Sequence, residues 1–205
     1  MTAPLTLYSN AMSRGRIARW MLEEVGQAYD VVYIDFGEQM KSAEYLAINP
    51  MGKVPALKHG DTIVTEYAAI CAYLADAFPE AGLVPANRGP YYRWLFFGAG
   101  PLEAAIINAS LGFSVPEGKR GQVGFGSIKT TLDALEFALT ENPYLAGDSF
   151  SAADVATGSQ IGYGLRFGTI ESRGVFEAYW NRIATRPAHK RAEALDNAAM
   201  QERKG

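Results

Sequence analysis

The pattern of hydrophobic residues differs between the two parts of this chain of 205 residues, and the difference limits the folds that it can adopt. Up to residue 80, short β-branched or aromatic segments alternate with segments whose apolar residues recur at helical spacing. Beyond residue 90 only the helical spacing continues. Mixed elements followed by helices alone indicate two domains. We expect a mixed domain at residues 1–80, a linker rich in Gly, Pro and Asn at 81–90, and an all-helical domain at 91–205.

The mixed domain is predicted to have the element order β-α-β-α-β-β-α. Its strands are expected at residues 5–8, 29–34, 54–57 and 62–64, and its helices at 17–25, 39–48 and 65–78. Gly26 and Pro79 are stop signals after the first and third helices, and Gly60 lies in the turn between the last two strands. The order resembles the thioredoxin topology. The predicted fold class is therefore α/β followed by all-α, with a thioredoxin-like N-terminal domain.

The remaining helices are expected at residues 91–111, around 128–139, from Ser151 onward, and around 176–183. Pro187 is predicted to open a short final helix, followed by a frayed tail at 201–205. Ser151 and Asp154 have the spacing of a capping box, and Phe150 and Val155 stand where a hydrophobic staple would close. We interpret this segment as a folding signal and not as a site.

Composition excludes several functions. The net charge is -3 and the Lys and Arg residues are scattered, which argues against nucleic acid as a partner. The sequence has no apolar run long enough to span a membrane and no signal-peptide pattern at its start. A single cysteine, Cys71, excludes internal disulfides and dithiol chemistry, and it is expected to be a small core residue. The two histidines, His59 and His189, have no partners at metal-ligand spacing, so no metal is expected. These features favour a cytoplasmic protein.

Two segments carry a possible chemistry. In the run from Asn49 to Leu57, the Val54–Pro55 bond stands at a strand entrance. The resemblance to the thioredoxin topology, in which this bond is typically cis, implies a cis bond here. That geometry would let Val54 pair through its main chain with an extended peptide, although a structural turn is an equally good interpretation. The run from Thr65 to Ile70 begins a helix, whose N-terminus attracts carboxylates. Glu66 beside it could bind an ammonium, or could simply favour the helix dipole.

Together with the run from Pro143 to Asp154, these segments resemble the cytosolic glutathione transferase family over nearly the whole chain. The resemblance implies a glutathione co-substrate, no metal, and main-chain hydrogen bonds from Val54, beside Pro55, to the cysteinyl part of glutathione. It also implies that Glu66 and the N–H of Tyr67 hold the γ-glutamyl end. Near the glycyl carboxylate it places Lys53, Lys41 or Gln39. Most members carry Ser or Thr where this chain has Tyr67.

The group that activates the thiol is expected between the first strand and the first helix, because an ordinary thiol is mostly protonated at neutral pH. Ser13 is the preferred candidate. The run from Ser13 to Glu24 resembles bacterial and fungal transferases with Ser-Arg in the catalytic loop. A hydroxyl at a helix N-terminus can donate to a sulfur while the dipole favours the thiolate. A plain N-cap is the competing interpretation of Ser13, and Tyr8 and Asn10 are the alternative activators.

The second substrate implied by the resemblance is a small hydrophobic electrophile in an apolar cleft. The predicted lining residues are Asn10, Met12, Phe97, Gly100 and Ile106, with Phe113, Tyr163 and Phe167 as weaker candidates. The resemblance also implies a homodimer with a role in detoxification. Two alternatives stay open: a non-catalytic binding or regulatory protein with this fold, and a glutathione-dependent lyase or isomerase of narrow specificity.

Overall fold

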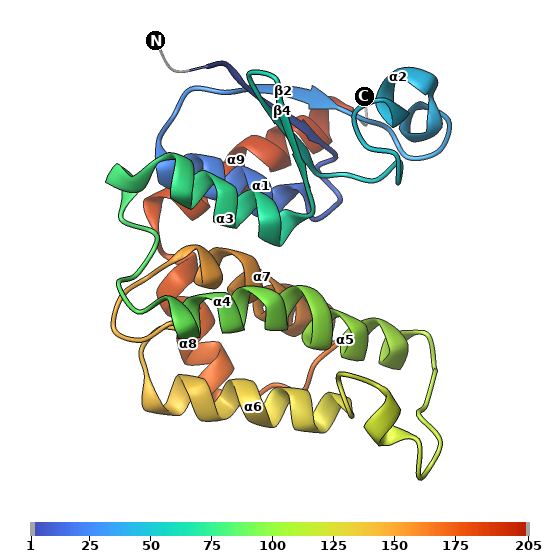
Figure 1. Cartoon of the computed structure of the whole chain (residues 1–205), viewed down its shortest axis with the longest axis vertical. Coiled ribbons are helices and arrows are strands. Elements are labelled where there is room, and N and C mark those ends of the chain that lie inside the picture. Colours follow the sequence, from blue (N-terminus) through green and yellow to red (C-terminus); the bar gives the residue numbers. More distant parts are fainter. Residues whose placement is uncertain (1–2, 204–205) are drawn as a thin grey trace. The chain divides into compact units, whose positions relative to one another are not determined.

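The computed structural model describes residues 3–203 and divides the chain into two compact units (Figure 1). The first unit contains the residues up to Ala81 together with those from Arg186 onward, and the second runs from Gly82 to Thr185. The last helix is therefore grouped with the first unit, whereas the sequence pattern assigned it to the helical domain. The reason is its packing, described below.

The first unit is built on a four-stranded sheet in the order β2-β1-β3-β4. Its strands are β1 (Leu5–Ser9), β2 (Asp30–Tyr33), β3 (Ala56–His59) and β4 (Thr62–Thr65). The β1 and β2 strands are parallel, and the other two pairings are antiparallel. The predicted hairpin is confirmed, with Gly60 in the turn at a φ of 58° that favours glycine. The predicted thioredoxin-like topology is confirmed as well.

Helices α1 (Gly15–Val25) and α3 (Tyr67–Ala77) pack together on this sheet. Helix α1 ends at Gly26, in the left-handed conformation expected of a helix stop. The weak helical signal at 39–48 corresponds to two short pieces, η1 (Gln39–Lys41) and α2 (Ala43–Leu46). A 3₁₀ turn, η2 (Pro79–Ala81), follows α3.

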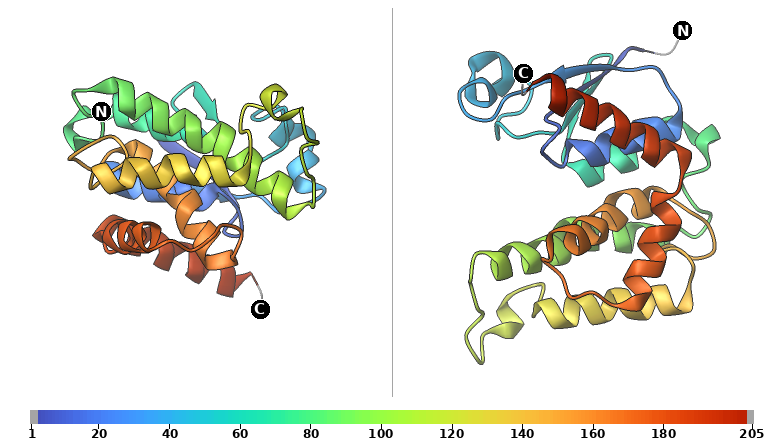
Figure 2. Two further views of the ribbon diagram at one scale, coloured as in Figure 1. Left: turned by 90° about the horizontal axis from the view of Figure 1, so that it is seen from below. Right: turned by 180° about the vertical axis from the view of Figure 1, so that it is seen from behind.

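The final helix, α9 (Pro187–Glu202), was expected to be short but has sixteen residues, and it lies along α1 (Figure 2). At the centre of the α1–α9 contact, Arg19 forms an ion pair with Asp196, Nε to Oδ1 at 3.2 Å, and both side chains are buried. Arg19 also donates to the hydroxyl of Tyr33 at 2.7 Å. The contact between α1 and α9 therefore includes a buried ion pair, which the apolar pattern of the sequence does not reveal.

The second unit is all helical. Its longer helices are α4 (Arg88–Phe97), α5 (Glu103–Ser110), α6 (Ile128–Glu141), α7 (Ala152–Phe167) and α8 (Gly174–Ala184), with a 3₁₀ turn η4 (Arg120–Gln122). The single helix predicted over 91–111 is instead split by a π-helical turn, η3 (Gly98–Leu102), which contains Pro101. Proline has no N–H to donate, so the regular ladder is interrupted there. Beside the turn, the Thr157 hydroxyl donates to the Trp94 carbonyl at 2.6 Å, and a Cβ on Gly98 would lie 2.1 Å from that hydroxyl.

The predicted capping box at the start of α7 is confirmed. Asp154 accepts hydrogen bonds from the N–H and the hydroxyl of Ser151, both at 2.9 Å. The same carboxylate accepts from the N–H of Leu145 at 2.9 Å and from the Tyr179 hydroxyl at 2.8 Å. Burial raises the pKa of Asp154, and these donors lower it. The carboxylate therefore joins α7, α8 and the preceding loop.

The buried Arg19–Asp196 pair gives a test of the α1–α9 contact. Burial raises the pKa of Asp196 to about 6, against the lowering effect of Arg19 and Arg16. We predict that Arg19→Met leaves an unpaired buried carboxylate and lowers the free energy of unfolding by about 3–5 kcal/mol above pH 6. Without Arg19 the Asp196 pKa rises further, so the folded state takes up a proton that the unfolded state releases. The deficit relative to wild type should therefore shrink as pH falls from the raised pKa of the variant to about 6, and stay constant below that pH, where Asp196 is protonated in both folded proteins.

Urea unfolding at several pH values measures this difference. Lys129→Met is the matched control, because it breaks an exposed Lys129–Asp133 pair and should lower stability by less than about 1 kcal/mol. An Arg19→Met deficit that is as small as this control, or independent of pH, would contradict the description of the pair.

Candidate active site

The register of the sheet brings the predicted site segments to one edge. Tyr8 lies opposite Ala56 on β3, and Ala56 lies opposite Thr65 on β4. The loop after β1, the loop before β3 and the start of α3 therefore all leave the sheet at the same end. In this way Ser13, Val54 and Glu66, which are far apart in the sequence, belong to one edge of the first unit.

The loop between β1 and α1 is held by its own polar groups. The Ser13 hydroxyl donates to the carbonyl of Asn10 at 2.7 Å and accepts from the N–H of Gly15 at 2.9 Å. Buried Asn10 donates through Nδ2 to the Ile34 carbonyl at 3.0 Å and accepts at Oδ1 from the N–H of Met12 at 2.9 Å. Ser13 thus closes the turn that starts α1, and Asn10 ties the loop to the end of β2.

Gly15 makes this geometry possible. A Cβ at Gly15 would lie 2.0 Å from the Ser9 Oγ and 3.0 Å from the Ser13 Oγ, so no larger residue fits without a shift. Ser9 is fully buried at the end of β1. The close approach of α1 to β1 therefore places the Ser13 hydroxyl at the helix N-terminus.

Tyr8, the alternative activator, packs differently. Its ring lies 6.0 Å from the ring of Tyr45, and it packs against a small core of Ile34, Met40 and Tyr45, as does Val54. Tyr8 is half-buried and precedes the loop by two residues. These contacts give Tyr8 a packing role beneath the loops.

Arg16 was missed by the sequence interpretation. Its Nε donates to the carbonyl of Ala11 at 2.6 Å, and its Nη2 donates to Asn197 Oδ1 at 2.9 Å and lies 3.0 Å from Met200 Sδ. Arg16 therefore connects the β1–α1 loop with α9. No sequence signal could have indicated this, because Arg16 and Asn197 are 181 residues apart and neither is part of a recognisable motif.

The loop before β3 is fixed by side chains from the η1–α2 segment. The Tyr45 hydroxyl and the Asn49 Nδ2 donate to the carbonyl of Lys53 at 2.6 and 2.7 Å. The Lys41 ammonium donates to the carbonyls of Met51 and Gly52 at 3.0 and 3.1 Å. Burial is the main cause that raises the pKa of Tyr45 to about 12, so this hydroxyl remains a donor near neutral pH.

These contacts position Val54 at the edge of the sheet. The Val54–Pro55 bond is cis, as predicted. Of the residues predicted near a carboxylate, Lys41 already serves the loop, and the side-chain Oε1 of Gln39 accepts from the N–H of Asp35 at 2.6 Å. Lys41 and Gln39 thus already form hydrogen bonds within the protein, whereas Lys53 is exposed to solvent.

Glu66 has an unusual backbone conformation. It stands at the N-cap of α3 with φ 68° and ψ 119°, and no other non-glycine residue among 3–203 has a positive φ. Such conformations are strained and are found mostly at functional sites. The Glu66 side chain is exposed at the helix N-terminus, whereas Tyr67 after it is buried.

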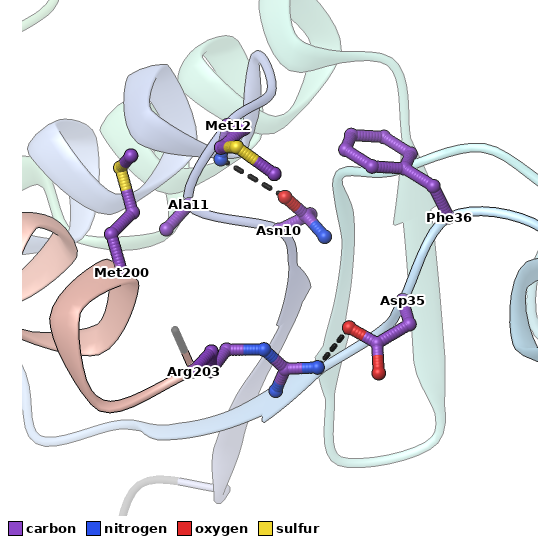
Figure 3. Close-up of a pocket in the computed structure, with 7 residues that line it drawn as sticks. All are labelled: Asn10, Ala11, Met12, Asp35, Phe36, Met200 and Arg203. Atoms are coloured by element: carbon purple, nitrogen blue, oxygen red, sulfur yellow. Dashed lines mark hydrogen bonds and ion pairs between the residues drawn. The ribbon is translucent and has the colours of Figure 1, made fainter. Parts of the chain in front are cut away.

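A pocket of about 310 Å³ adjoins the β1–α1 loop within the first unit (Figure 3). Its lining residues are Asn10, Ala11, Met12, Asp35, Phe36, Met200 and Arg203. Two of the predicted second-substrate residues, Asn10 and Met12, are among them. Ala11 belongs to the same loop, and the other four residues come from segments to which the sequence interpretation assigned no role.

The remaining second-substrate candidates belong to the second unit. Phe97 is half-buried with its ring 5.1 Å from that of Trp94, Gly100 lies in the π-helical turn, and Ile106 is buried in α5. Among the weaker candidates, Phe113 and Phe167 are exposed and Tyr163 is half-buried.

Three further findings complete the description of the structure. Within residues 3–203, no group of three or more His, Cys, Asp or Glu side chains is arranged to hold a metal ion. Cys71 is buried, as predicted, and burial raises its thiol pKa, so the thiol is kept protonated. No helix of the described part of the chain has the length and apolar character needed to cross a membrane.

The sequence and the fold both match known proteins. Residues 3–76 match the family "Glutathione S-transferase, N-terminal domain". The chain is 32% identical to glutathione S-transferase 1 of Zea mays, over 94% of this chain and 97% of that protein. A glutathione transferase from Methylococcus capsulatus has a similar structure, with a TM-score of 0.77 at 28% identity over 95% of this chain and 99% of that one.

A sphingomonad glutathione S-transferase, solved in complex with glutathione, gives a TM-score of 0.73 at 26% identity over 94% of this chain and 98% of that one. The chain belongs to the glutathione S-transferase family. The fold class and the enzyme class predicted from the sequence are confirmed.

The strain at Glu66 leads to a prediction about stability. We predict that Glu66→Gly raises the free energy of unfolding by about 1 kcal/mol, because glycine adopts a positive φ without a Cβ penalty. Glu66→Ala removes the same carboxylate but keeps the Cβ, so it should not stabilise the protein in this way. Urea unfolding of both variants measures the difference. Equal stability of the two variants would show that the backbone at Glu66 is not strained.

Proposed function

We propose that this chain binds glutathione at the edge of the sheet defined above and presents its sulfur as a thiolate to a hydrophobic electrophile. The observation that carries the proposal is the convergence of Ser13, Val54 and Glu66 at one edge of the sheet. Membership of the glutathione S-transferase family supports it, as does the similarity to a transferase solved with glutathione.

The chemistry of glutathione fits the groups at this edge. The main chain of Val54 pairs with the cysteinyl part as an added strand would. The exposed carboxylate of Glu66 binds the free ammonium, and the N-terminus of α3 at Tyr67 binds the adjoining carboxylate. The exposed ammonium of Lys53 takes the glycyl carboxylate, while Lys41 and Gln39 hold the loops around it.

Thiolate formation is assigned to the start of α1. The thiol of glutathione has an ordinary pKa of about 8.5, so a donor and a positive field are needed at neutral pH. The Ser13 hydroxyl now donates to the Asn10 carbonyl, and in the complex it turns its proton to the sulfur. The dipole of α1 adds to the stabilisation. Arg16 positions the loop through the Ala11 carbonyl. The thiol proton passes to solvent.

The wider proposals follow the family. The electrophile is held beside the β1–α1 loop by Asn10 and Met12. A role for Phe97, Gly100 and Ile106 in holding it stays a prediction. We also propose a cytoplasmic homodimer of the Ser-Arg subtype found in bacteria and fungi. Helix α4 supplies an apolar surface for the dimer contact, because Tyr92 and Phe96 are exposed while Tyr91 and Trp94 face the core.

Substitution of Ser13 tests the catalytic part. We predict that Ser13→Ala lowers kcat for chlorodinitrobenzene by about 10²-fold, as expected for loss of one donor to a developing anion. The affinity for glutathione, measured by calorimetry, should change little. The Ser13 contacts also close the turn, so stability should fall by about 1 kcal/mol.

Ser127→Ala is the matched control, because Ser127 caps α6 through the N–H of Thr130 at 3.1 Å and lies in the second unit. It should have the same modest effect on stability and none on kcat. An unchanged kcat in Ser13→Ala would move the activating role to Tyr8, Asn10 or the loop backbone. Glutathione binding without turnover would favour the non-catalytic alternative, and turnover restricted to one narrow substrate class would favour the lyase or isomerase.

A further inference from the structure

The pocket beside the β1–α1 loop has features that point to a class of ligand. We propose that it selects electrophiles with a carboxylate on an apolar body, and that Arg203 recognises this carboxylate. The inference rests on the proposed function only in assigning the ligand as the electrophile. The pocket itself lies wholly in the first unit, and its volume of about 310 Å³ is at the lower end of the range of small-molecule sites.

The walls suit an apolar body. Met12 and Phe36 are large apolar side chains with 64% and 55% of their surface exposed, and they lie on the same side of the pocket (Figure 3). Met200 of α9 and Ala11 also line the pocket, on the left of the view (Figure 3). Exposed apolar groups that gather at a cavity mark a binding surface, and methionine adapts to ligands of different shape.

The charged groups of the pocket favour an anion. Asp35 and Arg203 are the charged residues among those that line it, and they form an ion pair across it (Figure 3). The Arg203 guanidinium also lies 5.6 Å from the centre of the Tyr33 ring, which supports it from outside the pocket. Arg16, whose Nη2 contacts Met200, adds positive charge behind the wall.

A carboxylate can compete for Arg203. The guanidinium has five N–H donors in a planar fork, and its bond to Asp35 uses Nη2 alone. Asp35 has 61% of its side chain exposed, so its carboxylate returns to water easily, and exposed pairs of this kind are weak. A ligand carboxylate next to apolar walls is less well screened and can form the bidentate pair.

The reaction with such a substrate balances simply. For a chlorodinitrobenzoate, the thiolate sulfur forms a bond with the ring carbon that carries chlorine. Chloride leaves with the electron pair of the C–Cl bond. The substrate carboxylate remains on Arg203 and takes no part in the bond changes.

Binding of two inert ligands to the full-length protein tests the pocket without any turnover. Calorimetry would compare dinitrobenzoate with its uncharged parent dinitrobenzene. We expect the wild type to prefer the acid and Arg203→Gln to bind the acid about tenfold more weakly, with dinitrobenzene unchanged. Asp35→Asn removes the competing carboxylate and should bind the acid severalfold more tightly.

Arg191→Gln is the control, because Arg191 is an exposed arginine of α9 that pairs with Glu23 and does not line the pocket. It should leave both affinities unchanged. The proposal is overturned if Arg203→Gln and Arg191→Gln have equal effects on the acid, if Arg203→Gln weakens both ligands equally, or if Asp35→Asn does not strengthen binding of the acid.

Turnover then separates this inference from the proposed function. With chlorodinitrobenzoate, Arg203→Gln should raise the KM for the acid and leave the KM for glutathione unchanged. If neither chlorodinitrobenzoate nor chlorodinitrobenzene is turned over, the proposed function fails, while the predicted order of affinities for the inert acid still supports Arg203 as the carboxylate site.

Discussion

The hydrogen-bonded register between β1 and β3 is the constraint on which the site depends. It places Tyr8 opposite Ala56, and the β3–β4 hairpin extends that row to Thr65. A shift by one residue would turn every side chain to the other face of the sheet and move the loops apart. Because this row is fixed, the three segments that carry Ser13, Val54 and Glu66 end at one edge of the sheet. The position of the functional groups therefore depends first on strand pairing, and only then on individual residues.

The C-terminal helix is the second structural support. It packs on α1 through the buried Arg19–Asp196 pair, and Arg16 reaches from the first turn of α1 to both the Ala11 carbonyl and Asn197. The loop that carries Ser13 is thus held by β1 at one end and by α9, through Arg16, on another side. The same helix brings Met200 and Arg203 to the pocket. One element therefore contributes to stability, to loop position and to the proposed choice of substrate.

Local signals in the sequence predicted most of the fold. The hairpin glycine, the helix stop at Gly26 and the Ser151–Asp154 capping box each act over a few residues, so their effects can be inferred from spacing alone. The family motifs that indicated the Val54 and Glu66 segments are also short and local, so they too could be recognised from the sequence. The π-helical turn was missed because the helical pattern of aromatic and apolar residues was followed across Pro101, although this proline interrupts the regular ladder.

The parts of the site that could not be predicted are those made by contacts between distant segments. Arg16 with Asn197 and Arg203 with Asp35 join residues 181 and 168 positions apart, and neither pair has a distinctive spacing. The actual bonds of Ser13 were open for a similar reason. An N-cap and a catalytic serine would occupy the same position in the sequence. The structure shows that the Ser13 hydroxyl donates to the Asn10 carbonyl and accepts from the Gly15 N–H.

The central claim is that this edge of the sheet ionises the thiol of bound glutathione. The most direct measurement is the ultraviolet absorbance of the thiolate as a function of pH, with the protein in excess over glutathione. The account predicts that the thiol of the bound peptide titrates well below its ordinary pKa of about 8.5. A bound thiol that titrates at the same pH as free glutathione would contradict it.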